Sequence, residues 1–443
     1  MKINKIEITN FRGFQRETRK FTTNLTVVIG NNTAGKTTLL KALQIGIGAY
    51  LQCLGKLPCT QQYRRNFSIR DRFMAFDPQE RDYVPNDGKT KIAIDASFFV
   101  TDGIVGQEPK FVPTHISWSR VFTGSSTTHN RTCAGQLMDA VKEMETKKYG
   151  LHSGAVYPLV LSFGAKRTSD AQVKLSRKIK ERASRVEKAY KFALHDKVDF
   201  EGAMEWLSRY DKNIKDGKEF EGTKEAFYDA LQTAIPALSE IDFDHGEIEA
   251  VVTVSGHEPS RHHFSYMSDG LQSMINIVAE IAHRCIELNG CLGRNAIKKT
   301  PGVVMIDEID LYLHPHWQKH VLQDLCAAFP MIQFIVSTHS PFIVQSLRKD
   351  QLISFDDDVL VDGEPYRESL EDITSARMGL KQDIRSQRFK EMQDIAKEYY
   401  QSIQKGENDE ELLDKLRCIE SNFSDNPAYV ALLQSEYNTK GNS

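Results

Sequence analysis

The chain has 443 residues, which is too many for one simple core and few for three independent domains. A net charge of −3 excludes a global field for nucleic acid or membranes, and 40% hydrophobic with 26% charged residues excludes a disordered chain. No apolar run approaches the roughly 20 residues of a membrane span, and no signal-peptide core is present, so we expect a cytoplasmic protein with no membrane partner.

The N-terminal region predicts strands followed by a phosphate-binding loop. Residues 2–9 alternate apolar and polar side chains like a strand, FRGF (11–14) turns the chain, and LTVVIG (25–30) has the pattern of a short buried strand. GNNTAGKTT follows at once, and a helical pattern with one apolar face comes after it. This order of strand, loop and helix is the one that the motif G-x-x-x-x-G-K-[ST] requires.

The loop predicts an ATP site with Mg²⁺. Its backbone N–H groups and the helix N-terminus form a cradle for the phosphates, Lys36 supplies a positive charge, and Thr37 supplies an oxygen for Mg²⁺. The predicted nucleotide-binding residues of the loop are Gly30, Asn31, Asn32, Thr33, Ala34, Gly35, Lys36, Thr37 and Thr38.

The middle of the chain mixes strands with a charged segment. Residues 55–90 are expected to be irregular, whereas 91–100, 114–122 and 157–163 have strand patterns. From residue 169 to residue 238 the chain is charged and mostly helical, with a break near 211–222. Because no heptad pattern persists there, a long coiled coil is not predicted.

Two carboxylates end a buried strand in the second half of the chain. The apolar residues of GVVMI lead into Asp307 and Glu308, an arrangement typical of a Walker B motif. Asp307 would hold the Mg²⁺ shell, and Glu308 would accept a proton from the attacking water. After the next buried strand, FIVS, comes His339, which we expect to sense the γ-phosphate through a hydrogen bond.

The segment MSDG marks the start of a helix. Ser268 has the position of an N-cap, which by itself indicates only that a helix begins there. The same geometry, however, aims the Ser268 hydroxyl and the free N–H groups near Gly270 at an anion.

Continuous apolar strands that alternate with helices predict an α/β fold with a mainly parallel sheet. We expect the N-terminal part of an ATPase head in 1–165, a helical insert in 166–240 and the C-terminal part of the head in 241–350. Residues 351–443 would form a hairpin and a helical tail that serves assembly.

Five motifs in one order, FRGF, GNNTAGKT, SDG, MIDE and STHSP, resemble ABC-type P-loop ATPases of the SMC, Rad50, RecF and OLD group. The resemblance implies ATP held between two head-to-head copies, with Ser268 of one copy reaching the γ-phosphate on the other. It also implies that Arg12 lies near the nucleotide. Asp269 stands where the family's signature commonly has a glycine, and no Q-loop glutamine is identified. For Arg167 two interpretations stay open, a residue that senses nucleotide or partner and a surface arginine.

Within this group the chain resembles most the PtuA-like ATPases of Septu and retron defence systems, on YPLVLSFGAKR, MSDGLQSMINIVAEIA, IDEIDLYLHPHWQ and DNPAYVALL. This resemblance implies an anti-phage ATPase that forms a dimer or a higher even oligomer. It further implies assembly with an HNH-type nuclease, and in retrons with a reverse transcriptase and its RNA–DNA product.

Other functions stay open. A free-standing RecF-like DNA-binding ATPase of DNA repair is the main alternative, and the arginine-rich segment Gln61–Arg72 suits either direct DNA contact or a solvated loop. An OLD-type nuclease would need a Toprim domain, which Asp356–Asp358 and Asp362 do not complete. The loop histidines His257, His262 and His263 lack metal-ligand spacing and favour a solvated hairpin.

Overall fold

The computed structural model describes residues 1–379 except 87, 103–109, 125, 147–154, 166–182, 197, 254–255, 257 and 357–362. Beyond Gly379 it describes residues 394, 395, 397, 398, 401, 414 and 417. The chain divides into two compact units, Met1–Gly379 and Leu380–Ser443. All elements discussed below belong to the first unit.

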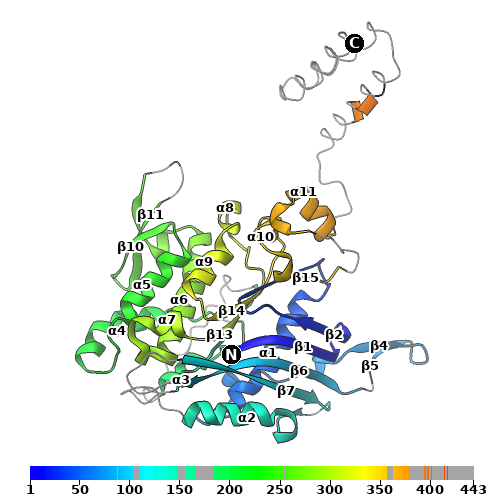
Figure 1. The fold of residues 1–443 in the computed structure, drawn as a ribbon, viewed down its shortest axis with the longest axis horizontal. Coiled ribbons are helices and arrows are strands. Elements are labelled where there is room, and N and C mark those ends of the chain that lie inside the picture. Colours follow the sequence, from blue (N-terminus) through cyan, green and yellow to red (C-terminus); the bar gives the residue numbers. More distant parts are fainter. Residues whose placement is uncertain are drawn as a thin grey trace. The chain divides into compact units, whose positions relative to one another are not determined.

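An antiparallel sheet is built mainly from the N-terminal third (Figure 1). Its strands, in the order β2-β1-β6-β7-β8, are β2 (Phe14–Lys20), β1 (Lys2–Phe11), β6 (Thr90–Asp102), β7 (Lys110–Phe122) and β8 (Thr127–Thr128). The FRGF sequence is the tight turn between β1 and β2, where Phe11 pairs with Phe14. Residues 55–90, expected to be irregular, also contain the small hairpin β4 (Met74–Asp77) and β5 (Asp82–Pro85).

A parallel sheet carries the motifs with continuous apolar strands. Its order is β15-β3-β14-β13-β9, with β15 (Leu352–Ser354), β3 (Leu25–Ile29), β14 (Ile332–Ser337), β13 (Gly302–Ile306) and β9 (Leu159–Phe163). Every residue of β3, β13 and β9 is buried, as expected for a sheet covered on both faces. All five strands end at one edge, so the loops that follow them can converge.

The prediction of a mainly parallel sheet is therefore correct for one of the two large sheets. Strand β1 pairs antiparallel with β6, and β6 pairs antiparallel with β7, so the N-terminal strands form a separate sheet. Residues 352–366 were expected to form a hairpin, but β15 pairs in parallel with β3. Residues 357–362, in the second half of that segment, lie outside the described residues.

Side-chain packing joins the two sheets. Helix α1 (Lys36–Cys53) lies against β6 at Gly46, where an added Cβ would stand 2.4 Å from Ile94 Cδ1. On β14, the buried side-chain amide of Gln333 accepts from Ile3 N–H at 2.7 Å and donates to Ile3 O at 2.8 Å. The Gln333 side chain thus makes with β1 the pair of hydrogen bonds that the backbone of a neighbouring strand would make.

The remaining helices cover the sheets, and several pack around α6 (Asp269–Asn289). These helices are α2 (Arg131–Thr146), α3 (Arg185–Tyr190), α4 (Phe200–Lys215), α5 (Thr223–Ala234), α7 (Ala296–Lys299), α8 (Pro315–Gln318), α9 (Val321–Ala328), α10 (Pro341–Gln345) and α11 (Leu370–Asp372). The gap between α4 and α5 falls within the break expected at 211–222. A three-stranded antiparallel sheet, β10 (Leu238–Asp244), β11 (Glu247–Val252) and β12 (Ser260–His263), follows α5.

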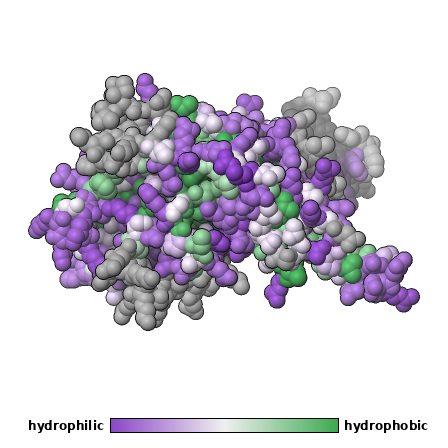
Figure 2. Space-filling model, turned by 90° about the horizontal axis from the view of Figure 1, so that it is seen from below, coloured by the Kyte–Doolittle hydropathy of each residue, from purple (hydrophilic) through white to green (hydrophobic). Residues whose placement is uncertain are grey.

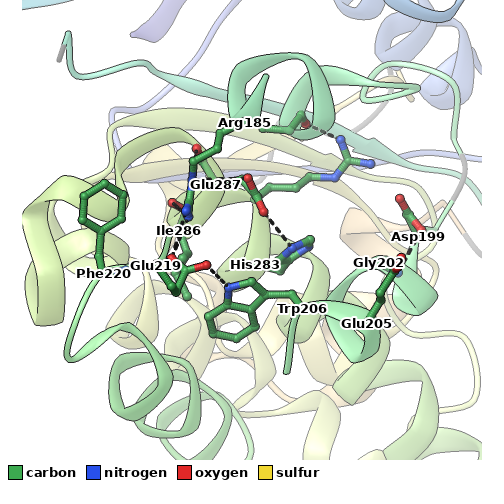
Figure 3. A network of polar contacts seen from close by, with 12 residues as sticks. Arg185, Asp199, Gly202, Glu205, Trp206, Glu219, Phe220, His283, Ile286 and Glu287 are labelled. Carbon is green, nitrogen blue, oxygen red and sulfur yellow. Dashed lines mark hydrogen bonds and ion pairs between the residues drawn. The ribbon is translucent and has the colours of Figure 1, made fainter. Parts of the chain in front are cut away.

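A network of polar contacts fastens the described part of the predicted insert to α6 (Figure 3). Arg185 of α3 pairs with Glu219 at 2.9 Å and with Glu287 of α6 at 3.4 Å. The Trp206 indole of α4 donates to Glu219 at 2.8 Å, and His283 of α6 lies 3.6 Å from Glu287. The insert helices therefore pack directly on the helix that begins at the SDG motif.

In the described part of the chain, no helix combines the length and apolarity needed to cross a bilayer. The face seen in Figure 2 is mostly hydrophilic, with small and separate hydrophobic patches.

Candidate functional site

The phosphate loop depends on glycine at two positions. Gly30 has φ +149° and Gly35 has φ +113°, values that favour glycine over other residues. A Cβ added to Gly35 would lie 2.5 Å from the ring of Phe14, the last residue of FRGF. The N-terminal turn thus packs against the loop itself, while Asn31, Asn32 and Thr33 are exposed on it.

Lys36 lies buried at the first residue of α1, with 7% of its surface exposed. Its ammonium donates to the carbonyl of Gly30 at 2.6 Å and to that of Asn31 at 2.9 Å. Burial lowers the pKa of Lys36, and neighbouring carboxylates, Asp356 first and Asp307 second, oppose that shift. A buried ammonium inside a loop of backbone donors fits the phosphates of a nucleotide.

Thr37 and Asp307 come together across the chain. The Thr37 hydroxyl donates to Asp307 Oδ2 at 3.0 Å, and the Ser337 hydroxyl donates to the other carboxylate oxygen. The same Ser337 oxygen accepts from the N–H of Glu308 at 2.9 Å. A hydroxyl and a carboxylate at this distance are oxygen ligands of the kind that Mg²⁺ prefers, so the donor set fits the predicted metal.

Glu308 has an unusual backbone. It follows β13 directly and has φ +51°, in the left-handed region that a residue other than glycine enters at a cost of about 1–3 kcal/mol. Its N–H bond to Ser337 and the strand pairing of β13 with β14 hold this conformation. The half-buried carboxylate is thus aimed by the main chain, next to the predicted Mg²⁺ ligand Asp307.

His339 is exposed just beyond β14, and its role as a sensor of the phosphate stays a prediction. Its N–H donates to Asp310 Oδ1 at 3.3 Å, and the neighbouring Thr338 hydroxyl donates to the same oxygen at 2.6 Å. Asp310 therefore links the loop after β13 to the loop after β14. Sequence reasoning missed Asp310 and Ser337, although a third carboxylate in DEID and the serine of STHS were signals for them.

Arg12 is held by a partner that the sequence did not reveal. Its guanidinium pairs with Asp71 Oδ1 at 2.8 Å, and its N–H donates to Asp71 O at 2.9 Å. Asp71 is 4% exposed and also accepts from the N–H and hydroxyl of Ser68. The arginine-rich segment Gln61–Arg72 is thus attached to the FRGF turn, and the contact of Arg12 with nucleotide stays a prediction.

Ser268 stands at the N-terminus of α6 and is exposed. Among the described residues, its side chain makes no capping hydrogen bond to the helix, although its position is that of an N-cap. A Cβ on Gly270 would meet the carbonyl of Tyr312 at 2.5 Å, so this glycine allows the helix to approach the loop after β13. Within the part of the chain that the structure describes, no hydrogen bond joins Ser268 to the phosphate loop of its own chain.

Some predicted residues fall outside the description. Arg167, His257, Asp357, Asp358 and Asp362 belong to the residues that the structure leaves undescribed. His262 and His263 both lie on β12. His262 hydrogen-bonds with the Ser260 hydroxyl at 2.7 Å, and His263 lies 3.9 Å from Glu249 of β11.

Two family models match the chain over the elements that build this site. Residues 1–190 match the "AAA ATPase domain", and residues 194–345 match the "AAA domain, putative AbiEii toxin, Type IV TA system". Together the matches include the phosphate loop, the acidic pair and His339. Both matched regions are therefore similar to ATPase domains of the P-loop class.

Named relatives of this class are similar over shorter stretches. "Retron Vc95 probable ATPase" of Vibrio cholerae serotype O1 biovar El Tor is 44% identical over 86 residues, 19% of this chain and 16% of the relative. "Retron Ec83 probable ATPase" of Escherichia coli is 32% identical over 27% of this chain and 21% of the relative. "Septu protein PtuA" of Bacillus thuringiensis is 34% identical over 21% of this chain and 23% of the relative. Each alignment thus spans less than a quarter of the relative's own length.

Solved structures similar to this fold include the SMC head domain from Thermotoga maritima, with a TM-score of 0.41 and 14% identity over 80% of this chain and 94% of that chain. An SmcHead bound to the C-winged helix domain of ScpA has a TM-score of 0.45 and 16% identity over 80% and 94% of the two chains.

Proposed function

We propose that this chain binds ATP with Mg²⁺ and hydrolyses it, with Glu308 as the general base. The observation that carries the proposal is the bond of Thr37 to Asp307, with Glu308 next in sequence and fixed by Ser337. Lys36 and the loop N–H groups would bind the phosphates, and Thr37 with Asp307 would hold Mg²⁺, which when bound neutralises charge on the phosphates.

Glu308 would orient a water molecule and take up its proton, because its carboxylate lies beside the predicted metal ligand and its backbone is fixed. His339 would donate a hydrogen bond toward the phosphate, since its exposed ring extends from a loop held by Asp310. These assignments use residues that follow three strands, β3, β13 and β14, at the carboxyl edge of one sheet.

We further propose that two copies close head to head, with Ser268 of each copy completing the site of the other. Support comes from the exposed Ser268 hydroxyl at the start of the 21-residue helix α6 and from the resemblance of the motif order to ABC-type ATPases. The positive end of the helix dipole would then face an anion across the interface.

Mixing two inactive variants tests this arrangement. Ser268→Arg and Lys36→Ala should each abolish hydrolysis alone, because one blocks closure and the other removes the phosphate-binding charge. Mixed in equal amounts, half of the dimers are mixed and one of their two sites is intact, so about a quarter of the parental rate should return. A mixture no more active than its components would contradict a site shared between copies.

The biological role that we propose is regulation of a separate HNH-type nuclease in anti-phage defence, in some systems beside a reverse transcriptase with RNA–DNA. The similarity to retron ATPases and to Septu PtuA supports this role. We expect the nuclease to co-purify in equal amount with the tagged chain expressed from its native locus. A preparation of the chain alone, with hydrolysis stimulated by DNA, would favour the RecF-like alternative instead.

A further inference from the structure

Asp356 lies at the phosphate loop because two parallel strands end side by side. β15 pairs with β3 so that Ser354 stands opposite Ile29, and Phe355 N–H donates to Ile29 O at 3.1 Å. Two residues beyond the ends of these strands, Asp356 meets Asn31. The N–H of Asn31 is 3.2 Å from both carboxylate oxygens of Asp356, and Asn31 Nδ2 donates to Oδ1 at 3.1 Å.

Packing fixes Asp356 in this place. The ring of Phe355 stacks on that of Phe14 with centroids 5.5 Å apart, and Phe14 in turn lies against Gly35. A Cβ on Gly30 would stand 3.0 Å from Phe355 Cβ. Phe355, the residue before Asp356, therefore packs directly against Gly30 and reaches Gly35 through the ring of Phe14.

A third residue, Gly379, lies beside the contact between Asp356 and Asn31. Gly379, with φ +68°, lies so close that a Cβ there would be 3.4 Å from Asn31 Nδ2 and 3.5 Å from Asp356 Oδ2. Gly379 is the last residue of the first unit, and the chain continues from it into Leu380–Ser443. Three residues far apart in the sequence, Asn31, Asp356 and Gly379, thus lie close together at the phosphate loop.

Asp356 places a negative charge where a polyanion is expected to bind. Asp356 bonds to Asn31, whose carbonyl accepts from the Lys36 ammonium at 2.9 Å, so the Asp356 carboxylate lies near that cation. It also accepts a backbone N–H of the loop that forms the anion cradle. The negative phosphate groups of a nucleotide bound at Lys36 would therefore be repelled by the negative carboxylate of Asp356.

We propose that Asp356 is a built-in anion of the nucleotide site: it holds the phosphate loop at Asn31 and weakens nucleotide binding through its charge. The inference rests on the proposed ATP-binding function. It assigns to Asp356 a direct control over nucleotide affinity, a role distinct from phosphate binding and from proton transfer.

The test compares binding of a fluorescent ATP analogue, with Mg²⁺, to the full chain and to Asp356→Asn. The amide keeps the shape and one acceptor but removes the charge, so the affinity should rise about fivefold to tenfold at low salt. The difference should shrink between about 0.05 M and about 0.5 M NaCl, since salt screens charge and leaves shape unchanged.

Two further variants separate charge from structure. Asp356→Glu keeps the charge and should bind the analogue no more tightly than the parental chain. Asp350→Asn removes a carboxylate just before β15, one that is exposed and paired with Arg348, and should leave the affinity unchanged. Equal or weaker binding by Asp356→Asn would overturn the inference and leave Asp356 as a structural support. Absence of binding in every chain would overturn the nucleotide site itself, and the inference with it.

Discussion

Replacing Glu308 by glutamine is expected to lower the rate of ATP hydrolysis by about 10²- to 10⁴-fold while ATP remains bound, since general bases contribute about that much. Lys36, Thr37 and Asp307 keep their places in the variant. Glutamine has the shape of glutamate but cannot accept the proton. Its backbone N–H still bonds to Ser337, so the conformation at φ +51° should survive.

Phosphate release in a single turnover, measured beside equilibrium binding of ATP, separates the two effects in Glu308→Gln. Glu205→Gln is a matched control, because Glu205 is an exposed carboxylate on α4 that pairs with Arg209 on the same helix. Hydrolysis at the parental rate in Glu308→Gln would show that another residue is the base. Loss of ATP binding would show instead that the carboxylate supports the fold of the site.

Replacing Glu280 by alanine is expected to lower the free energy of unfolding by about 3–5 kcal/mol, the cost of leaving a buried partner charge unpaired. Glu280 is 0% exposed and Arg284 is 3% exposed, both on α6. Arg284 donates to Glu280 at 2.9 Å, and the N–H of Asp199 donates to it at 2.8 Å. Without Glu280, the Arg284 guanidinium would keep only bonds to the carbonyls of Ala189 and Lys191 among the described contacts.

Urea unfolding of Glu280→Ala and of Glu205→Ala checks this expectation. The control breaks an exposed pair on α4, which should cost about 0.5 kcal/mol. Burial raises the pKa of Glu280 to about 7, so a neutral side chain is tolerated there, and Glu280→Gln should cost less than Glu280→Ala. Equal losses in Glu280→Ala and in the control would contradict the importance of the buried pair.

The sequence predicted the parallel sheet best, because its strands are short apolar runs between loops of known chemistry. GVVMI and FIVS appear as β13 and β14, and the phosphate loop lies between β3 and α1. The antiparallel partners were harder, since β2 is a polar strand, FQRETRK, that shows no apolar alternation. Helix α2 was missed as well.

The sequence identified candidate site residues where they belong to short motifs. It did not identify the residues that meet those candidates only through tertiary contact. Asp71 binds Arg12 from 59 positions away, and Asp356 meets Asn31 from 325 positions away. No local pattern encodes such a meeting, because it depends on which strands become neighbours. Asp356 was considered in the sequence only as part of an incomplete nuclease motif.

The order of strands in the parallel sheet has a consequence for dividing this chain. β3 comes from the N-terminal half, yet its neighbours β14 and β15 both come from the C-terminal half, and β9 pairs with β13 in the same way. Gln333 adds a bond to Ile3 across 330 positions. A cut between residues 190 and 194, where the two family matches meet, would therefore leave two fragments with unpaired strands. Expressed separately, the two fragments should be insoluble. Expressed together, they should reassemble as a split protein, and recovery of nucleotide binding would measure that reassembly.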